Sequence, residues 1–260
     1  SIFFKCSGHP PLSPPLPPAR APHLAPPNLR VLWQLSGIHG DATYIVYEDR
    51  RYTYAQIQAI SSAFAAHLAS IGVTKGDRVA IAMRNLPEYP MAFWAAASMG
   101  AVVVPLNAWW TGPELAYGLS DSGARVLIAD DERIARLQPH MSETKVEHIF
   151  TTVEGFPAAP LPDVEIDPDD DATIMYTSGT TGKPKGAVGT HRNFCGHVMN
   201  AIYNAQASVA PAVDATPPTD TVAPPQASTV LTFPLFHVGG LQSTLAPLTV
   251  AGGKIVLRFK

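Results

Sequence analysis

The polar and apolar positions of residues 54–71 repeat with the period of a helix. Apolar side chains recur at intervals of three and four residues, at Ile57, Ile60, Phe64, Leu68 and Ile71. Such a stripe predicts an amphipathic helix with one face in a core. Thr53 and Gln56 have the spacing of a capping box at its start, and Gly72 suits its end.

The rest of the chain alternates between helix and strand patterns. Thr111 and Glu114 form a second capping box, which begins another helix. Val31, Leu32 and Leu35 are expected to share one face of the first helix, and residues 193–203 are expected to form a later one. Short apolar runs predict strands at 43–47, 51–53, 79–83, 126–128, 148–150, 172–176, 186–189, 229–233 and 255–259. This alternation predicts an α/β fold, with mostly parallel sheets flanked by helices.

The most apolar window, residues 91–104, lies between Pro90 and Pro105. It is shorter than the roughly 20 residues that a membrane-spanning helix needs. It also contains Gly100, followed by the β-branched run 102–104. A buried helix followed by a buried strand is therefore the prediction, and no membrane span is expected.

Composition narrows the classes of function. A chain of 260 residues can hold one large or two modest domains. Its net charge is −3 and it has no basic block, so nothing points to nucleic acid. Cys6 and Cys195 do not make a disulfide framework, and a cytoplasmic location is expected. The apolar run 2–4 is too short for a secretory signal.

Two segments are expected to lie outside the folded core. Residues 1–28 are rich in proline and are interpreted as a disordered leader, in preference to a docking site for a proline-binding partner. Residues 206–227 are rich in Ala, Pro, Thr and Asp and are interpreted as a mobile insertion. Residues 29–260 form the predicted domain. The chain begins with Ser1, which suggests a fragment or a processed product.

The segment with the clearest chemistry is Tyr176-Thr177-Ser178-Gly179-Thr180-Thr181-Gly182-Lys183-Pro184-Lys185-Gly186. Glycines let backbone N–H groups turn toward an anion, hydroxyls add donors, and a lysine can follow a phosphate. It is not a Walker loop, because Pro184 follows Gly182-Lys183 and Thr177 stands where that pattern needs Gly. An ordinary polar turn between strands is the alternative. The loop follows a predicted strand, where ligands bind in parallel sheets.

This string resembles the signature phosphate loop of the acyl-adenylate-forming enzymes, which include acyl-CoA synthetases, the adenylation domains of peptide synthetases, and luciferases. The family pattern Tyr-Thr-Ser-Gly-Thr-Thr-Gly-x-Pro-Lys-Gly is met at every fixed position. A second string, Pro234-Leu235-Phe236-His237-Val238-Gly239-Gly240, resembles the family's later core motif, whose His lies near the acyl and adenylate pocket. In looser form the resemblance extends over residues 27–260, and it implies the N-terminal domain of such an enzyme, present incompletely.

The resemblance implies activation of a carboxylic acid by ATP as acyl-AMP, then thioester formation with coenzyme A, and a fatty acid is the favoured substrate. ATP, with Mg²⁺ carried on its phosphates, and coenzyme A are the implied small-molecule partners. The implied nucleotide-binding residues are Thr177, Ser178, Gly179, Thr180, Thr181, Gly182 and Lys185. Lys183, at the variable position, has less weight. No residue is assigned to a metal.

His237 is the implied catalytic residue, and a core histidine is the alternative. His191 is expected to order local backbone instead. Trp109 and Trp110 could wall an acyl tunnel, but aromatic residues near a helix start are more often core, so neither is assigned.

The family's later motifs, which hold the ribose and contribute a C-terminal lysine, are not found before Lys260. The chain is therefore interpreted as the N-terminal part of an acid–thiol ligase that is expected not to adenylate a substrate alone. The alternatives are an adenylation domain that loads a carrier protein, a non-catalytic truncated protein that binds nucleotide, and, by family only, a luciferase-like oxidase.

Overall fold

The computed structural model describes residues 25–178, 182–209 and 225–258. Most of the predicted leader and most of the predicted insertion lie outside these ranges. Where these two segments meet the folded domain, the boundaries predicted from the sequence differ from those in the structure. Asn28, assigned to the leader, caps the first helix. The helix predicted at 193–203 runs from His191 to Val209, and so includes the first residues assigned to the insertion.

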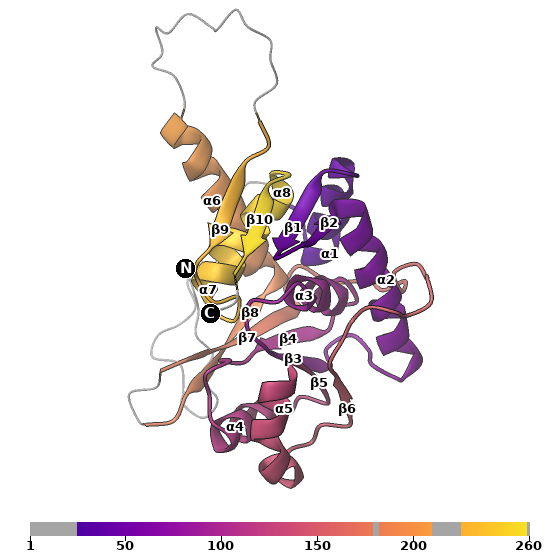
Figure 1. Cartoon of the computed structure of the whole chain (residues 1–260), viewed down its shortest axis with the longest axis vertical. Helices are drawn as coiled ribbons and strands as arrows, with labels where there is room; N and C mark the ends of the chain where they lie inside the picture. The colour runs from indigo at the N-terminus through magenta and orange to yellow at the C-terminus, as the bar shows by residue number, and fades with distance from the viewer. Residues whose placement is uncertain (1–24, 179–181, 210–224, 259–260) are drawn as a thin grey trace, which may run out of the picture.

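Within the described residues the strands form two sheets, both mostly parallel (Figure 1). The six-stranded sheet has the order β6 (His148–Phe150), β5 (Val126–Ala129), β3 (Arg78–Ala82), β4 (Val102–Pro105), β7 (Asp171–Thr177) and β8 (Lys185–Thr190). The four-stranded sheet has the order β2 (Arg50–Thr53), β1 (Thr43–Tyr47), β10 (Lys254–Leu257) and β9 (Ser228–Leu231). In the part of the chain that the structure describes, antiparallel pairing is confined to β1 with β2 and to β7 with β8. The predicted α/β fold is thus confirmed, and its strands are divided between two sheets.

Helices cover the sheets and fill the space between them. They are α1 (Leu29–Leu35), η1 (Ser36–His39), α2 (Tyr54–Ser70), α3 (Glu88–Ser98), α4 (Gly112–Ser122), α5 (Asp131–Leu137), η2 (Gln138–Glu143), α6 (His191–Val209), α7 (Val238–Gly240), η3 (Leu241–Leu245) and α8 (Ala246–Val250). Both predicted capping boxes form, Thr53 with Gln56 and Thr111 with Glu114.

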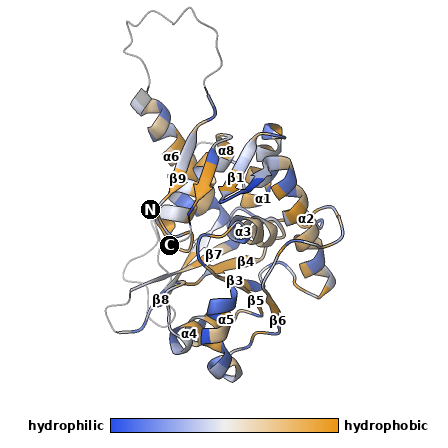
Figure 2. Ribbon diagram, in the orientation of Figure 1, coloured by the Kyte–Doolittle hydropathy of each residue, from blue (hydrophilic) through white to orange (hydrophobic). Residues whose placement is uncertain are grey.

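Successive side chains of β3 point to opposite faces of the sheet and belong to two different hydrophobic cores. Val79 and Ile81 belong to the large core that contains α1, α2 and α3, whereas Ala80 and Ala82 face the core under α4 and α5. Figure 2 shows the outer helix α5 as largely hydrophilic and β4 as largely hydrophobic. The six-stranded sheet is therefore covered on both sides, as its continuous apolar strands require.

Helix α3 lies between the two sheets (Figure 1) and is buried from Tyr89 to its end. Its Trp94 stacks on Trp33 of α1, with ring centroids 4.8 Å apart, and donates to the Tyr44 hydroxyl of β1. A helix that is apolar all round must be buried. This confirms the buried helix and strand predicted for residues 91–104.

Two apolar residues differ from the sequence-based prediction. Leu35 is 54% exposed, because the buried stripe of α1 is formed by Leu29, Leu32 and Trp33, and the large indole takes the place next to the core. Phe233 was predicted to end a strand, but β9 stops at Leu231 and Phe233 is exposed.

His191 orders backbone, as predicted. Its ring is fully buried, and its Nδ1 accepts a hydrogen bond from the Leu29 amide over 3.2 Å, so it joins the start of α6 to the start of α1. Burial lowers the pKa of His191 to about 4. A protonated Nδ1 could not accept this bond.

Stability is expected to depend on His191 as pH falls. Because the pKa is lower in the folded state than the unfolded value near 6.5, the stabilisation is complete above about pH 6.5 and is lost toward pH 4. The loss should be about 1.4 kcal/mol per pH unit. His191→Asn keeps an acceptor without titrating, so its urea-unfolding free energy should fall less steeply over this range. Equal slopes for the two proteins would contradict this assignment.

Candidate functional site

The phosphate-binding residues predicted from the sequence lie at the turn between β7 and β8. Thr177 ends β7 and pairs with Lys185, the first residue of β8, and its Oγ1 donates to the Lys185 carbonyl at 3.5 Å. Thr177, Ser178, Gly182 and Lys185 are all exposed. Gly179, Thr180 and Thr181 lie outside the described residues. This turn stands at the carboxyl end of a strand that pairs in parallel with β4, where ligands bind in such sheets.

Gly182 has a φ of 88°, a conformation that residues with a side chain rarely adopt. Apart from Gly182 and its chain neighbours, no atom of the described residues lies within 4 Å of the point where a Cβ would be. Gly182 is therefore needed for its conformation, and a ligand could approach it closely.

Helix α4 anchors both arms of the turn. On the β7 arm, the Tyr176 hydroxyl donates to the Asp121 carboxylate at 2.7 Å and lies 3.1 Å from the Gly118 carbonyl oxygen. Burial, and then the bond to Asp121, raise the pKa of Tyr176 far above its usual range. On the β8 arm, the Tyr117 hydroxyl donates to the Pro184 carbonyl at 3.1 Å. The sequence motif includes Tyr176 and Pro184 but gives no indication of their partners on α4.

The two lysines of the loop differ in their surroundings. The Lys183 ammonium lies 5.2 Å from the centre of the Tyr117 ring, which makes a cation–π contact. Lys185 is exposed at the edge of the sheet. These surroundings leave Lys185 in the better position to meet an anion.

The second motif forms a turn after β9 that leads into α7. His237 is exposed and caps α7: its Nδ1 accepts a hydrogen bond from the Gly239 amide at 3.1 Å. Its neutral form therefore carries the proton on Nε2, which can donate to a ligand. The exposure of His237 argues against the alternative of a core histidine.

The second motif is also joined to the strand that carries the phosphate loop. In the helix that follows α7, the Gln242 side chain donates to the Met175 sulfur of β7 at 3.5 Å. Met175 immediately precedes the first motif and Gln242 closely follows the second, so this hydrogen bond joins the segments next to the two motifs.

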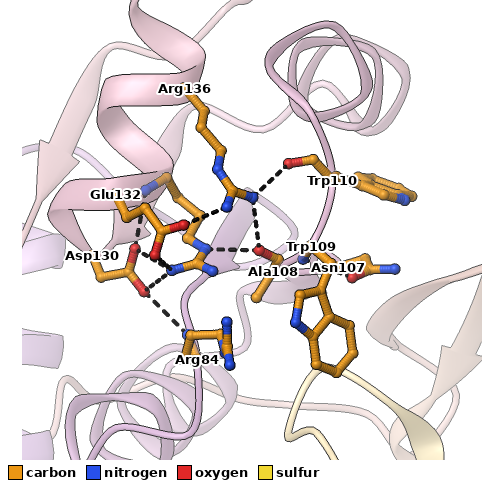
Figure 3. A network of polar contacts seen from close by, with 9 residues as sticks. Arg84, Asn107, Ala108, Trp109, Trp110, Asp130, Glu132 and Arg136 are labelled. Atoms are coloured by element: carbon orange, nitrogen blue, oxygen red, sulfur yellow. Dashed lines mark hydrogen bonds and ion pairs between the residues drawn. The ribbon is translucent and has the colours of Figure 1, made fainter. Parts of the chain in front are cut away.

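A polar network fixes the loops that follow β3, β4 and β5 (Figure 3). Its centre is Arg133, which is 1% exposed. The Arg133 guanidinium donates to both Asp130 oxygens at 3.1 and 3.0 Å and to the Ala108 carbonyl at 2.7 Å. Asp130 in turn accepts from the Arg84 amide at 3.1 Å. The ends of three neighbouring parallel strands are therefore tied together.

The network supports Trp109. Arg136 donates to the carbonyls of Ala108 and Trp110, on either side of Trp109. Trp110 is buried, as favoured from the sequence, but Trp109 is 54% exposed and packs edge-to-face on Phe236, beside His237. The Arg84 guanidinium lies 5.5 Å from the Trp109 ring centre. Trp109, which the sequence left unassigned, is therefore not a core residue.

Other chemistries find little support among the described residues. No group of three or more His, Cys, Asp or Glu side chains could hold a metal ion in those ranges. Cys195 is buried, and burial raises the pKa of its thiol to about 12, so it does not ionise at neutral pH. Nor does any helix of the described ranges have the length and apolarity to cross a membrane.

Comparison with known proteins gives one family. Residues 33–260 match the family described as "AMP-binding enzyme". Among curated relatives, a long-chain-fatty-acid–CoA ligase of Mycobacterium tuberculosis is 36% identical over 206 residues, 76% of this chain and 38% of that protein. A feruloyl-CoA synthase of a Streptomyces species is 33% identical over 223 residues, 83% of this chain and 40% of that protein. The chain thus spans about two fifths of the length of these relatives.

Solved structures show the same fold. The N-terminal domain of FACL13 from M. tuberculosis superposes with a TM-score of 0.72 and 29% identity, covering 90% of this chain and 58% of that one. A long-chain-fatty-acid–CoA ligase from Archaeoglobus fulgidus has a TM-score of 0.74 at 21% identity, covering 90% and 47%. The predicted N-terminal fold of adenylate-forming enzymes is confirmed.

Loss of Arg133 should destabilise this edge of the sheet. Arg133→Gln leaves the Asp130 carboxylate without its cation, and the free energy of unfolding should fall by about 3 kcal/mol in urea titrations. Arg136→Gln is the matched control, since it removes another guanidinium bound to Ala108 that is 34% exposed. That variant should lose less than about 1 kcal/mol. Equal losses would contradict a central role for Arg133.

Proposed function

This chain belongs to the AMP-binding enzyme family, and from that premise we propose that it supplies the triphosphate-binding part of an acid–thiol ligase. The ligase activates a carboxylic acid with ATP as acyl-AMP and then forms a thioester with coenzyme A. The observation that carries this proposal is the exposed turn of hydroxyls, glycine and lysine at the carboxyl end of β7. The curated relatives described above are named as a CoA ligase and a CoA synthase, which favours coenzyme A as the thiol.

The donor set of the turn fits a polyphosphate. Thr177 and Ser178 offer hydroxyl donors, Gly182 lets the backbone approach, and Lys185 offers a point charge. Gly179, Thr180 and Thr181 are assigned to the same role from the motif alone. Mg²⁺ bound with the ATP phosphates supplies further neutralisation of their charge. The residues of the turn stabilise the charge that develops on the α-phosphate and on the departing pyrophosphate.

His237 is proposed to face the acyl and adenylate groups. Its Nδ1 is already engaged by the Gly239 amide, so Nε2–H is the donor available to an oxygen of the substrate. Phe236 and Trp109 make an apolar contact next to it. This apolar setting supports a carboxylic acid with an apolar body, and a fatty acid is the favoured class.

Binding of Mg·ATP to the chain tests the nucleotide site directly. Isothermal titration calorimetry should detect binding to the wild-type chain. Lys185→Gln should weaken it by about tenfold or more, because a charge-assisted hydrogen bond contributes about 1.5–3 kcal/mol.

Two controls make this test specific. Lys145→Gln makes the same change of net charge at an exposed residue after η2, and it should leave the affinity unchanged. Lys183→Gln should have a smaller effect than Lys185→Gln, since that ammonium rests on Tyr117. Equal affinities of the Lys185 and Lys145 variants, or no binding by the wild type at millimolar ATP, would refute the proposed site.

A further inference from the structure

Asn85 connects the ends of the two sheets. It follows β3 of the six-stranded sheet, and it contacts the turn that follows β9 of the four-stranded sheet. Its Nδ2 donates to the Phe233 carbonyl at 2.9 Å, and its Oδ1 accepts from the Leu235 amide at 2.8 Å. One side chain therefore pairs with a donor and an acceptor about 150 residues away.

The two hydrogen bonds hold the stretch of backbone that leads to His237. Phe233 and Leu235 flank Pro234, whose carbonyl accepts a hydrogen bond from the His237 amide at 3.1 Å. Gly240 packs from the other side, where a Cβ atom would lie 2.1 Å from the same carbonyl oxygen. The Pro234 peptide is thus held by Asn85 on one side and by the start of α7 on the other.

Burial alone does not fix this turn. Phe233, His237 and Val238 are exposed, while Leu235 is buried and Phe236 packs partly buried against the core. Because apolar packing is non-directional, directed hydrogen bonds are what set the orientation of this turn.

Asn85 itself rests on a rigid support. The amide of its neighbour Arg84 donates to Asp130, and Asp130 is held by the buried Arg133 (Figure 3). The same network holds Trp109, which packs on Phe236 next to His237. A functional side chain keeps its geometry when the residues that support it are themselves fixed by packing and hydrogen bonds. Asn85 and Trp109, which both contact the His237 turn, are supported in this way.

We infer that Asn85 is a positioning residue for His237, which it holds at a fixed place relative to the ends of β3 and β4. The inference rests on the proposed function in one respect: the proposed function is the reason why the position of His237 matters. The geometry of the hydrogen bonds does not depend on nucleotide, and the test is therefore made without nucleotide.

The test follows the His237 ring by NMR in the nucleotide-free chain. The Cε1–H signal of His237 is identified by its loss in His237→Gln. In Asn85→Ala this signal should shift by more than its line width, or split into several signals, because the turn loses both hydrogen bonds. An unchanged signal in a folded Asn85→Ala protein would overturn the inference.

Asn28 offers a matched control. Its side chain also makes one donated and one accepted backbone hydrogen bond, to the Ile166 carbonyl and from the Val31 amide, both at 2.9 Å. Asn28→Ala should lower stability and leave the His237 signal in place. If Asn28→Ala moves the His237 signal as much as Asn85→Ala does, Asn85 contributes only to general stability and the inference fails.

Asn85→Asp provides a variant that retains half of the contact. The carboxylate still accepts from Leu235 but faces the Phe233 carbonyl oxygen without a proton. This oxygen raises the pKa of the introduced acid above its ordinary value of about 3.9. As pH falls toward about 5, the protonated acid regains a donor, and the difference between the variant and wild-type His237 signals should narrow. A difference that stays constant with pH would overturn the role of the Phe233 hydrogen bond.

The outcomes separate this inference from the proposed function. If Mg·ATP fails to bind while Asn85→Ala displaces the His237 signal, the positioning role stands and the nucleotide site fails. If Mg·ATP binds and the signal stays unmoved, the nucleotide site stands and the positioning role fails.

Discussion

The burial of α3 between the two sheets is the constraint on which the candidate site depends. Its indole Trp94 stacks on α1 and donates to Tyr44, whose hydroxyl is 2.5 Å from the Thr249 hydroxyl of α8. These contacts join α3 to the four-stranded sheet, and the core that α3 shares with Val79, Ile81 and Val103 joins it to the six-stranded one. Asn85 lies in the turn just before α3. The side chain that bonds to the His237 turn is therefore next to the start of the buried helix.

Two acidic side chains at the ends of the sheet strands and on α4 are already bound by hydrogen-bond donors, which favours the approach of an anion. Asp130 is bound by Arg133 and by a backbone amide, and Asp121 accepts the Tyr176 hydroxyl. Each carboxylate that helps to build the edge therefore has a donor of its own. Lys185, the first residue of β8, is exposed. A phosphate that approaches the turn would meet this charge and the hydroxyl donors, with the structural carboxylates already engaged.

The sequence predicted most local features, because they depend on residues close together in the chain. Both capping boxes, the buried run 91–104 and the strand before the phosphate loop are of this kind. The partition of the strands into two sheets, the anchoring of the loop by α4 and the exposure of Trp109 were not predicted. Each of these depends on contacts between residues that are distant in the chain. The spacing of residues in a short stretch of sequence does not reveal such contacts. The candidate site residues could therefore be proposed from the sequence, but the residues that hold them in place could not.

The way the phosphate turn is held bears on how it could release a ligand. Its two arms are fixed from outside, by Asp121 on the β7 arm and by Tyr117 on the β8 arm. The Thr177 hydroxyl makes only a 3.5 Å contact to the Lys185 carbonyl, well beyond the usual length of a hydroxyl hydrogen bond. Exchanging so weak a contact for a phosphate oxygen costs little. Rigid arms and a loosely bonded Thr177 hydroxyl suit the reversible nucleotide binding proposed above, because the arms are organised before a ligand arrives.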